Sequence, residues 1–222
     1  MFGIGQLERA PVTFALVVLV ALGYLAQQAV PSLTNAGLLH GPAVAAGEWW
    51  RLVSWGFLHG GLAHVGFNGF MLFALGPQLE RGIGSARFAL LYAGALFGGA
   101  LTVMLFDWPQ PTLGASGAVL GIAAALAIAL WMRGAPLRQV PAFGLVVLNL
   151  ALPLVLPGIS FWGHAGGIVA GAGMAWLLIR QARAGGTATA GGFALGAGGG
   201  AVLVIAALAL LAGTRGGVLP GA

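Results

Sequence analysis

Apolar runs long enough to cross a bilayer fill nearly the whole of this 222-residue sequence. A membrane-spanning helix needs about 20 predominantly apolar residues. Reading for such runs between Gly, Pro and Arg residues predicts seven helices, at 12–30, 58–76, 86–106, 114–132, 139–156, 161–180 and 193–212. Charged residues make up only 6% of the chain, against about 25% in soluble domains. The sequence therefore predicts an all-α, polytopic transmembrane bundle that forms a single membrane domain over 1–222.

The nine basic residues, all of them arginine, indicate how the helices are oriented. A cytoplasmic N-terminus leaves only Arg51 and Arg215 outside, as the positive-inside rule requires. The arginines stand at the ends of apolar runs rather than in a phosphate-binding patch, so we expect no nucleic-acid partner. We expect a multi-pass protein of a cell (inner or plasma) membrane, whose first helix is retained and not cleaved as a signal peptide.

Two connections between the predicted helices differ in character. The first loop, 31–57, contains Trp49, Trp50 and Trp55, and aromatic residues of this kind favour the headgroup layer. We therefore expect this loop to lie in the outer interface. The Gly-, Ala- and Thr-rich stretch 184–192 predicts a flexible linker to the last helix. The absence of cysteine from the sequence excludes disulfides and a thiol nucleophile.

Polar side chains that are costly inside a membrane gather in three of the predicted helices. His59, His64 and Asn68 lie in the first half of the second helix, Ser116 in the first turn of the fourth, and His164 at the start of the sixth. These three helices all run from outside to inside. The three polar places should therefore meet at one depth near the outer face.

A serine beside a histidine predicts acyl transfer, because a histidine can take the proton that makes a serine hydroxyl nucleophilic. We expect Ser116 to be the nucleophile and His164 the base. The Ser116 amide at its helix N-terminus, with His64 and Asn68, would supply donors to the oxyanion. Asp and Glu are absent from the predicted helix cores, which favours a dyad over a triad. HExxH is also absent, so we expect no metal and no cofactor.

Helical phase also predicts how the two catalytic helices pack. Gly167 and Gly171 share a face with His164, and Ala123 and Ala127 share a face with Ser116. Small residues let helices approach closely in lipid. We therefore expect the glycine face of one helix to pack on the alanine face of the other, while His59 points away from His64 and Asn68.

Four motifs in this order resemble those of the rhomboid family of intramembrane serine proteases, in its six-plus-one transmembrane form. The resemblance covers about 12–180 and rests on Glu48-Trp49-Trp50-Arg51, on His59 to His64 to Asn68, on Gly114-Ala115-Ser116-Gly117, and on His164 to Gly167 to Gly171. It implies a six-helix core with one extra C-terminal helix. It also implies hydrolysis of peptide bonds in or next to transmembrane segments of membrane-protein substrates.

The resemblance further implies roles for the motif residues. Ser116 and His164 would form the catalytic dyad, His64 and Asn68 the oxyanion site, His59 a structural histidine, and Arg51 an anchor of the first loop. An alternative is a rhomboid-like protein that binds membrane clients without cutting them, although such relatives typically lack the serine or the histidine. A transporter would instead carry polar residues along a whole pathway, and the third, fifth and seventh predicted helices carry essentially none.

Overall fold

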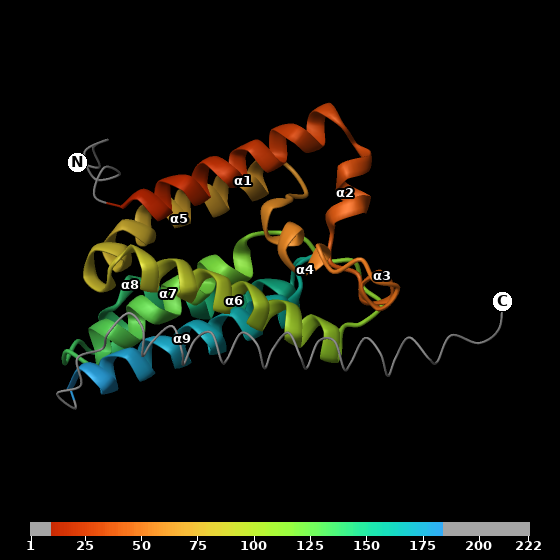
Figure 1. Cartoon of the computed structure of the whole chain (residues 1–222). Helices are drawn as coiled ribbons and strands as arrows, with labels where there is room; N and C mark the ends of the chain where they lie inside the picture. The colour runs from red at the N-terminus through yellow and green to blue at the C-terminus, as the bar shows by residue number, and fades with distance from the viewer. Residues whose placement is uncertain (1–9, 184–222) are drawn as a thin grey trace.

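The computed structural model describes residues 10–183, and its long elements in that range are all helices. Six of them form the bundle seen in Figure 1: α1 Pro11–Ala29, α5 Leu62–Ile83, α6 Ser85–Phe106, α7 Ser116–Trp131, α8 Pro141–Ala151 and α9 Phe161–Arg183. They correspond to the first six predicted helices, and the all-α polytopic fold is confirmed. The predicted linker 184–192 and seventh helix 193–212 lie outside the described residues.

Within residues 10–183, three helices are long and apolar enough to cross a membrane, namely α1, α6 and α9. A fourth candidate span is a bent pair, in which Arg51–Phe57 meets α5 at 93°. The exposed side chains of α1 include Phe14, Leu19 and Leu25. Lipid is the solvent that such a surface requires, since water would not solvate it favourably.

Helix α7 is shorter than a usual span, with 16 residues and a length of about 24 Å. It packs against α5, α6, α8 and α9, and every residue from Gly117 to Ala127 is buried. A helix that is apolar on all sides belongs in an interior. Because protein and not lipid surrounds α7, its ends do not have to reach both faces of the bilayer.

The closest packing joins α7 to α9 through glycines on both helices. A Cβ atom added at Gly117 would lie 2.6 Å from the Gly163 carbonyl oxygen, and one at Gly121 would lie 2.8 Å from that of Gly167. Gly171 likewise faces the Gly121 carbonyl. The prediction that an alanine face of α7 packs on α9 was therefore wrong. Gly117 and Gly121 form the contact, because the methyl group of an alanine would hold the two backbones apart.

Helix α5 begins and ends later than the predicted 58–76. Gly61 is extended and precedes the first helical residue, so His59 lies in the bend before α5 and not on the helix. At the other end, Pro77 is buried within the helix and does not terminate it. Transmembrane helices tolerate proline when neighbouring groups satisfy the freed backbone. The longer helix also contains Glu80, which corrects the prediction that Asp and Glu are absent from the helix cores.

Glu80 is 1% exposed and ties three helices together. Its Oε1 accepts hydrogen bonds from the Val12 amide at 3.0 Å and the Ser85 hydroxyl at 2.6 Å. Its Oε2 accepts from the Thr13 amide at 2.8 Å and hydroxyl at 2.7 Å. The carboxylate thus caps the N-terminus of α1, where amides lack helical partners. It lies at the end of α5 opposite His64, too far along the helix to serve a catalytic triad.

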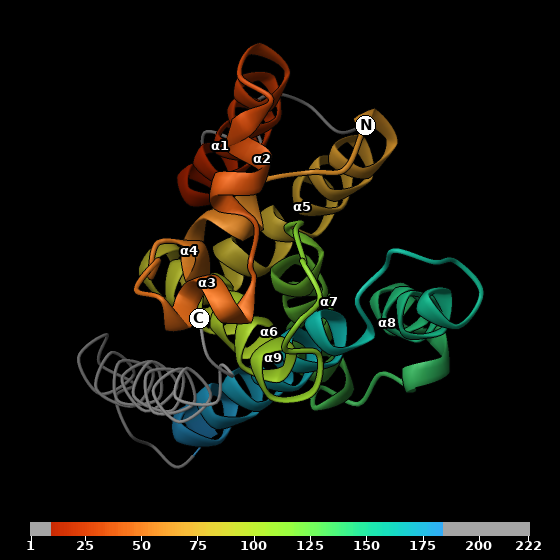
Figure 2. The same cartoon turned by 90° about the vertical axis from the view of Figure 1, so that its right-hand side faces the viewer.

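The first loop folds into short helices at one end of the bundle, including α2 Ser32–Gly37, α3 Gly41–Ala45 and α4 Arg51–Ser54 (Figure 2). Trp49 and Trp50 are exposed, as expected for an interfacial loop. The prediction for Trp55 was wrong, because this residue is 1% exposed in the 3₁₀ turn η2 Trp55–Phe57. Glycines on α6 and α7 leave room there for its ring.

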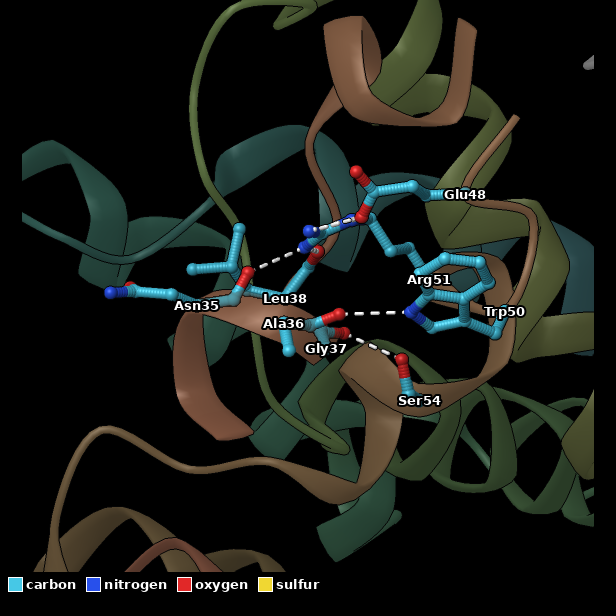
Figure 3. A network of polar contacts seen from close by, with 8 residues as sticks. All are labelled: Asn35, Ala36, Gly37, Leu38, Glu48, Trp50, Arg51 and Ser54. Carbon is cyan, nitrogen blue, oxygen red and sulfur yellow. Dashed lines mark hydrogen bonds and ion pairs between the residues drawn. The ribbon is translucent and has the colours of Figure 1, made fainter. Parts of the chain in front are cut away.

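Arg51 holds this loop together through both its charge and its guanidinium geometry (Figure 3). Its Nε donates to Glu48 Oε2 at 2.7 Å, within an ion pair. Its Nη1 donates to the Asn35 carbonyl at 2.7 Å and the Leu38 carbonyl at 2.8 Å. Trp50 adds an indole hydrogen bond to a carbonyl of α2. The planar guanidinium thus satisfies one carboxylate and two loop carbonyls at once.

Helix α8 lies at the edge of the bundle and packs mainly on α7 (Figure 2). It replaces the predicted span 139–156 with a shorter α-helix between two 3₁₀ turns, η3 Leu137–Gln139 and η4 Leu152–Leu154. Pro141 occupies its first turn, where a missing N–H costs nothing. Its C-terminal end, at η4, faces the starts of α7 and α9.

Candidate active site

Ser116 and His164 meet where α7 and α9 begin. Ser116 is the first residue of α7, and its Oγ lies 2.9 Å from Nε2 of His164 in the first turn of α9. His164 is 5% exposed, so protein surrounds most of its ring. The structure therefore brings together the two residues for which the sequence predicted a nucleophile and a base.

The start of α9 is fixed by hydrogen bonds that hold the His164 backbone in place. The Ser160 hydroxyl accepts from the Gly163 amide at 3.1 Å, and the Ser160 carbonyl accepts from the His164 amide at 3.3 Å. This is the arrangement of a serine N-cap. From α6, the Thr102 hydroxyl donates to the Trp162 carbonyl at 2.5 Å. Sequence reasoning missed Ser160, although a serine before an apolar run is a usual capping signal.

The second ring nitrogen of His164 also has a partner. Its Nδ1 lies 3.1 Å from the main-chain carbonyl oxygen of Asn149 in α8. A carbonyl only accepts, so this contact assigns the proton to Nδ1 and leaves a lone pair on Nε2, facing Ser116. A histidine base requires this tautomer. A backbone carbonyl thus stands where a triad would have an acid.

Glycine at 114 allows His64 to reach the site. Gly114 has a φ of +129°, a region that favours glycine. A Cβ atom there would lie 2.7 Å from Cε1 and 2.9 Å from Nε2 of His64. The Gly114 amide donates to the Trp55 carbonyl at 2.9 Å, which holds the loop against the core. The predicted glycine of the serine motif therefore has a steric role beside His64.

The predicted oxyanion donors face the same region. Nδ1 of His64 accepts from the Gly60 amide at 3.4 Å, which leaves Nε2 as the protonated nitrogen of a neutral ring. Nδ2 of Asn68 donates to the His64 carbonyl at 2.9 Å and retains a second N–H. The first helical bond of α7 joins the Val119 amide to Ala115. The Ser116 amide precedes that bond, so the helix gives it no acceptor.

His59 binds the segment that directly precedes Ser116. Its Nε2 accepts from the Ala115 amide at 3.4 Å, and its ring packs edge-on against His64 with the centroids 5.0 Å apart. Gln27 of α1 binds the His59 backbone on both sides, at 2.8 Å and 3.2 Å. The prediction that His59 points away from His64 was wrong, because His59 lies in the bend and not on the helix. Gln27 was not among the predicted site residues, although a polar residue in an apolar run is a signal that the sequence carries.

A cleft of about 710 Å³ joins these groups. Its polar lining includes Ser116, His164, His64, Asn68 and Asp107. Its apolar lining comes from α5, from the loop before α7, and from the chain that follows α8, with Ala63, Phe67, Leu113, Leu152, Leu156 and Ile159 among its residues. The cleft is large enough for an extended peptide segment, and Ser116 and His164 both line it.

Across residues 10–183, His, Cys, Asp and Glu do not gather in any group of three or more that could hold a metal ion. His59 and His64 are neighbours, but both rings already bind backbone amides. That a metal and a cofactor are not needed stays a prediction.

The fold and the site together define a helical membrane protein with a serine–histidine pair at the starts of two packed helices. The rhomboid domain matches residues 46–181, which is more than half of the chain. This chain therefore belongs to the rhomboid family. All four predicted motifs lie inside the matched range.

Named relatives agree with this assignment. Rhomboid protease GluP of Bacillus subtilis (strain 168) is 36% identical over 143 residues, which is 63% of this chain and 28% of the relative. RHOMBOID-like protein 4 of Arabidopsis thaliana is 33% identical over 151 residues, covering 66% and 38%. Rhomboid-type serine protease 2 of Emericella nidulans is 30% identical over 146 residues, covering 63% and 29%. The chain thus matches well under half of the length of each of these relatives.

Proposed function

We propose that this chain is an intramembrane serine endopeptidase that uses Ser116 as nucleophile and His164 as base. The observation that carries the proposal is the 2.9 Å contact between Ser116 Oγ and His164 Nε2, with the opposite ring nitrogen bound to a carbonyl. This geometry presents a lone pair to the serine hydroxyl. Membership of a family whose named relatives include serine proteases supports the same chemistry.

In the first half of the reaction, the Ser116 hydroxyl gives its proton to Nε2 of His164 as Oγ attacks the carbonyl carbon of the scissile peptide bond. The tetrahedral intermediate carries its negative charge on the former carbonyl oxygen. The Ser116 amide, the protonated Nε2 of His64 and the free N–H of Asn68 stabilise that oxyanion. His164 then passes its proton to the leaving nitrogen, the C–N bond breaks, and an ester to Ser116 remains.

In the second half, water replaces the departed amine. It gives a proton to His164 Nε2 and attacks the ester carbonyl, and the second tetrahedral intermediate uses the same donors. The proton returns to Ser116 Oγ as the ester bond breaks, which releases a carboxylic acid and restores the dyad. The Asn149 carbonyl stabilises the imidazolium that forms in each half through its contact with Nδ1.

The substrates we propose are membrane proteins cut near the outer end of a transmembrane helix. The arginine distribution favours a cytoplasmic N-terminus, which places the starts of α5, α7 and α9 on the outer side of the membrane. Water needed for hydrolysis reaches the cleft from that face. A helix in lipid has its carbonyls hydrogen-bonded, so Gly or Pro near the scissile bond eases unwinding. Small residues beside that bond suit a cleft whose lining includes Gly60, Ala63 and Gly163.

The experiment that tests this proposal is cleavage of a single-helix membrane substrate by the purified full chain in lipid, with the cut mapped by mass spectrometry. We expect cuts near the outer end of the substrate helix, and slower cutting when its Gly or Pro residues are changed to Leu. Ser116→Ala provides the matched control and should leave the substrate intact. Cuts at the cytoplasmic end, or rates that ignore the helix breakers, would contradict the proposed side and mechanism.

A further inference from the structure

The C-terminal end of α8 differs from an ordinary helix end in one backbone group. The last regular bond of α8 runs from the Leu152 amide to the Leu148 carbonyl. The next bond in that series would join residue 153 to the carbonyl of Asn149. Residue 153 is proline and has no N–H to donate. The backbone tightens there into the 3₁₀ turn η4, and the Asn149 carbonyl is left without its helical donor.

The carbonyl that Pro153 leaves without a helical partner is the one that binds His164. Asn149 is 4% exposed, so its carbonyl would be a buried, unpaired acceptor without another donor. Nδ1 of His164 supplies that donor at 3.1 Å. The Asn149 side chain is used elsewhere, since its Nδ2 donates to the Leu145 carbonyl at 2.9 Å. The main chain of Asn149, and not its side-chain amide, therefore faces the histidine.

We propose that Pro153 is a positioning residue for the dyad: it keeps the Asn149 carbonyl out of the α8 hydrogen-bond series, so that this carbonyl holds His164 with its proton on Nδ1. This inference rests on the proposed function for its effect on rate, and on geometry alone for its effect on the tautomer. A carbonyl aligned within a continued helix would point along the helix axis to residue 153. The imidazole would then lose the acceptor that distinguishes its two nitrogens. Part of the population would carry the proton on Nε2, and a protonated Nε2 cannot accept the Ser116 proton.

Pro153→Ala restores the N–H and is the central variant of the test. Nitrogen-15 NMR of the full chain in micelles, at a pH where histidines are neutral, reports which nitrogen of His164 is protonated. The His164 signals are assigned by their loss in His164→Gln. We expect the wild type to show a protonated Nδ1 and a bare Nε2, and Pro153→Ala to show a larger share of the opposite tautomer. The rate of Ser116 labelling by a fluorophosphonate should fall about tenfold, the scale of one lost hydrogen bond.

Pro157→Ala is the matched control, because Pro157 lies one turn further along the chain, is exposed, and has no part in the dyad. We expect its labelling rate to stay within about twofold of wild type. Asn149→Ala keeps the carbonyl and should lose less activity than Pro153→Ala.

A bare Nδ1 in the wild type, an unchanged tautomer and rate in Pro153→Ala, or an equal loss in Asn149→Ala would each overturn the proposal. A wild type that never reacts would refute the proposed function, and the tautomers would still decide the role of Pro153.

Discussion

The two ends of α5 both carry polar residues, and they use them in opposite ways. At one end, Glu80 accepts three hydrogen bonds from α1 and one from Ser85, and none of these residues lines the cleft that contains Ser116 and His164. At the other end, His64 and Asn68 line a cleft and retain donors that the protein does not use. A buried polar group whose partners are all satisfied stabilises the fold. Unused donors beside a serine–histidine pair are what a reacting oxygen would need.

The largest effect should follow from removing either member of the dyad. We expect Ser116→Ala and His164→Ala each to abolish cleavage while leaving the thermal unfolding temperature in micelles close to wild type. Residues that act as a unit are strongly non-additive, so the double variant should be no slower than either single one. Residual cleavage near wild type in Ser116→Ala would remove the assignment and, with it, the contrast between the two ends of α5.

A smaller but still large loss of activity should follow from substitutions of His64 and Asn68, at the end of α5 that lines the cleft. His64→Ala and Asn68→Ala should each lower kcat by about 10²–10³, the usual cost of one oxyanion donor. The Ser116 amide remains in both variants, so the loss should be partial. KM should change little, because these donors act on the transition state. Steady-state kinetics on a fluorogenic peptide distinguish the cases, and a raised KM with normal kcat would assign the two residues to substrate binding instead.

A substitution at the Glu80 end of α5 should lower the stability of the fold and leave the reactivity of Ser116 unchanged. Glu80→Ala leaves the Val12 and Thr13 amides and the Ser85 hydroxyl without their acceptor, and we expect it to lower the free energy of unfolding by about 3 kcal/mol. Thermal unfolding in micelles measures this. Gln78→Ala is the matched control, since Gln78 is an exposed neighbour on the same helix. Folded Glu80→Ala protein should still react with a fluorophosphonate, and a stable but unreactive variant would contradict this account.

The smallest effect should come from Asp107, a carboxylate that lines the cleft. Asp107→Asn should keep cleavage within about twofold of wild type, because a backbone carbonyl already orients His164. Kinetics on the same fluorogenic peptide test this. A collapse in kcat would indicate that the carboxylate acts on the dyad and would revive a triad.

The sequence predicted most of what positions the site. Counting apolar runs placed His64, Ser116 and His164 on helices of one direction, and a shared direction was enough to bring Ser116 and His164 to a common depth. It could not predict the Asn149 carbonyl, because a main-chain acceptor has no residue type that marks it. Pro153 lies inside the predicted fifth helix, 139–156, but the sequence does not show that its missing N–H leaves a carbonyl four residues earlier free to bind His164.

The wrong predictions about α5 and Trp55 also have a physical cause in tertiary contacts. Ending the second helix before Pro77 left Glu80 outside it, although packed neighbours let a transmembrane helix continue through a proline. Assigning Trp55 to the interface followed the average behaviour of tryptophan, and the glycines that make room for its ring lie far away in the sequence. Each error depended on tertiary contacts that local patterns do not contain.

The measurement that tests the central claim most directly is the site of fluorophosphonate modification, mapped by mass spectrometry on the full chain in lipid. We expect one adduct, on Ser116, that forms in the wild type and is absent from His164→Ala. Ser160 is the internal control, since it lines the same cleft but serves as the cap of α9. An adduct on Ser160, or a modified Ser116 that forms equally fast without His164, would contradict the assignment of the dyad.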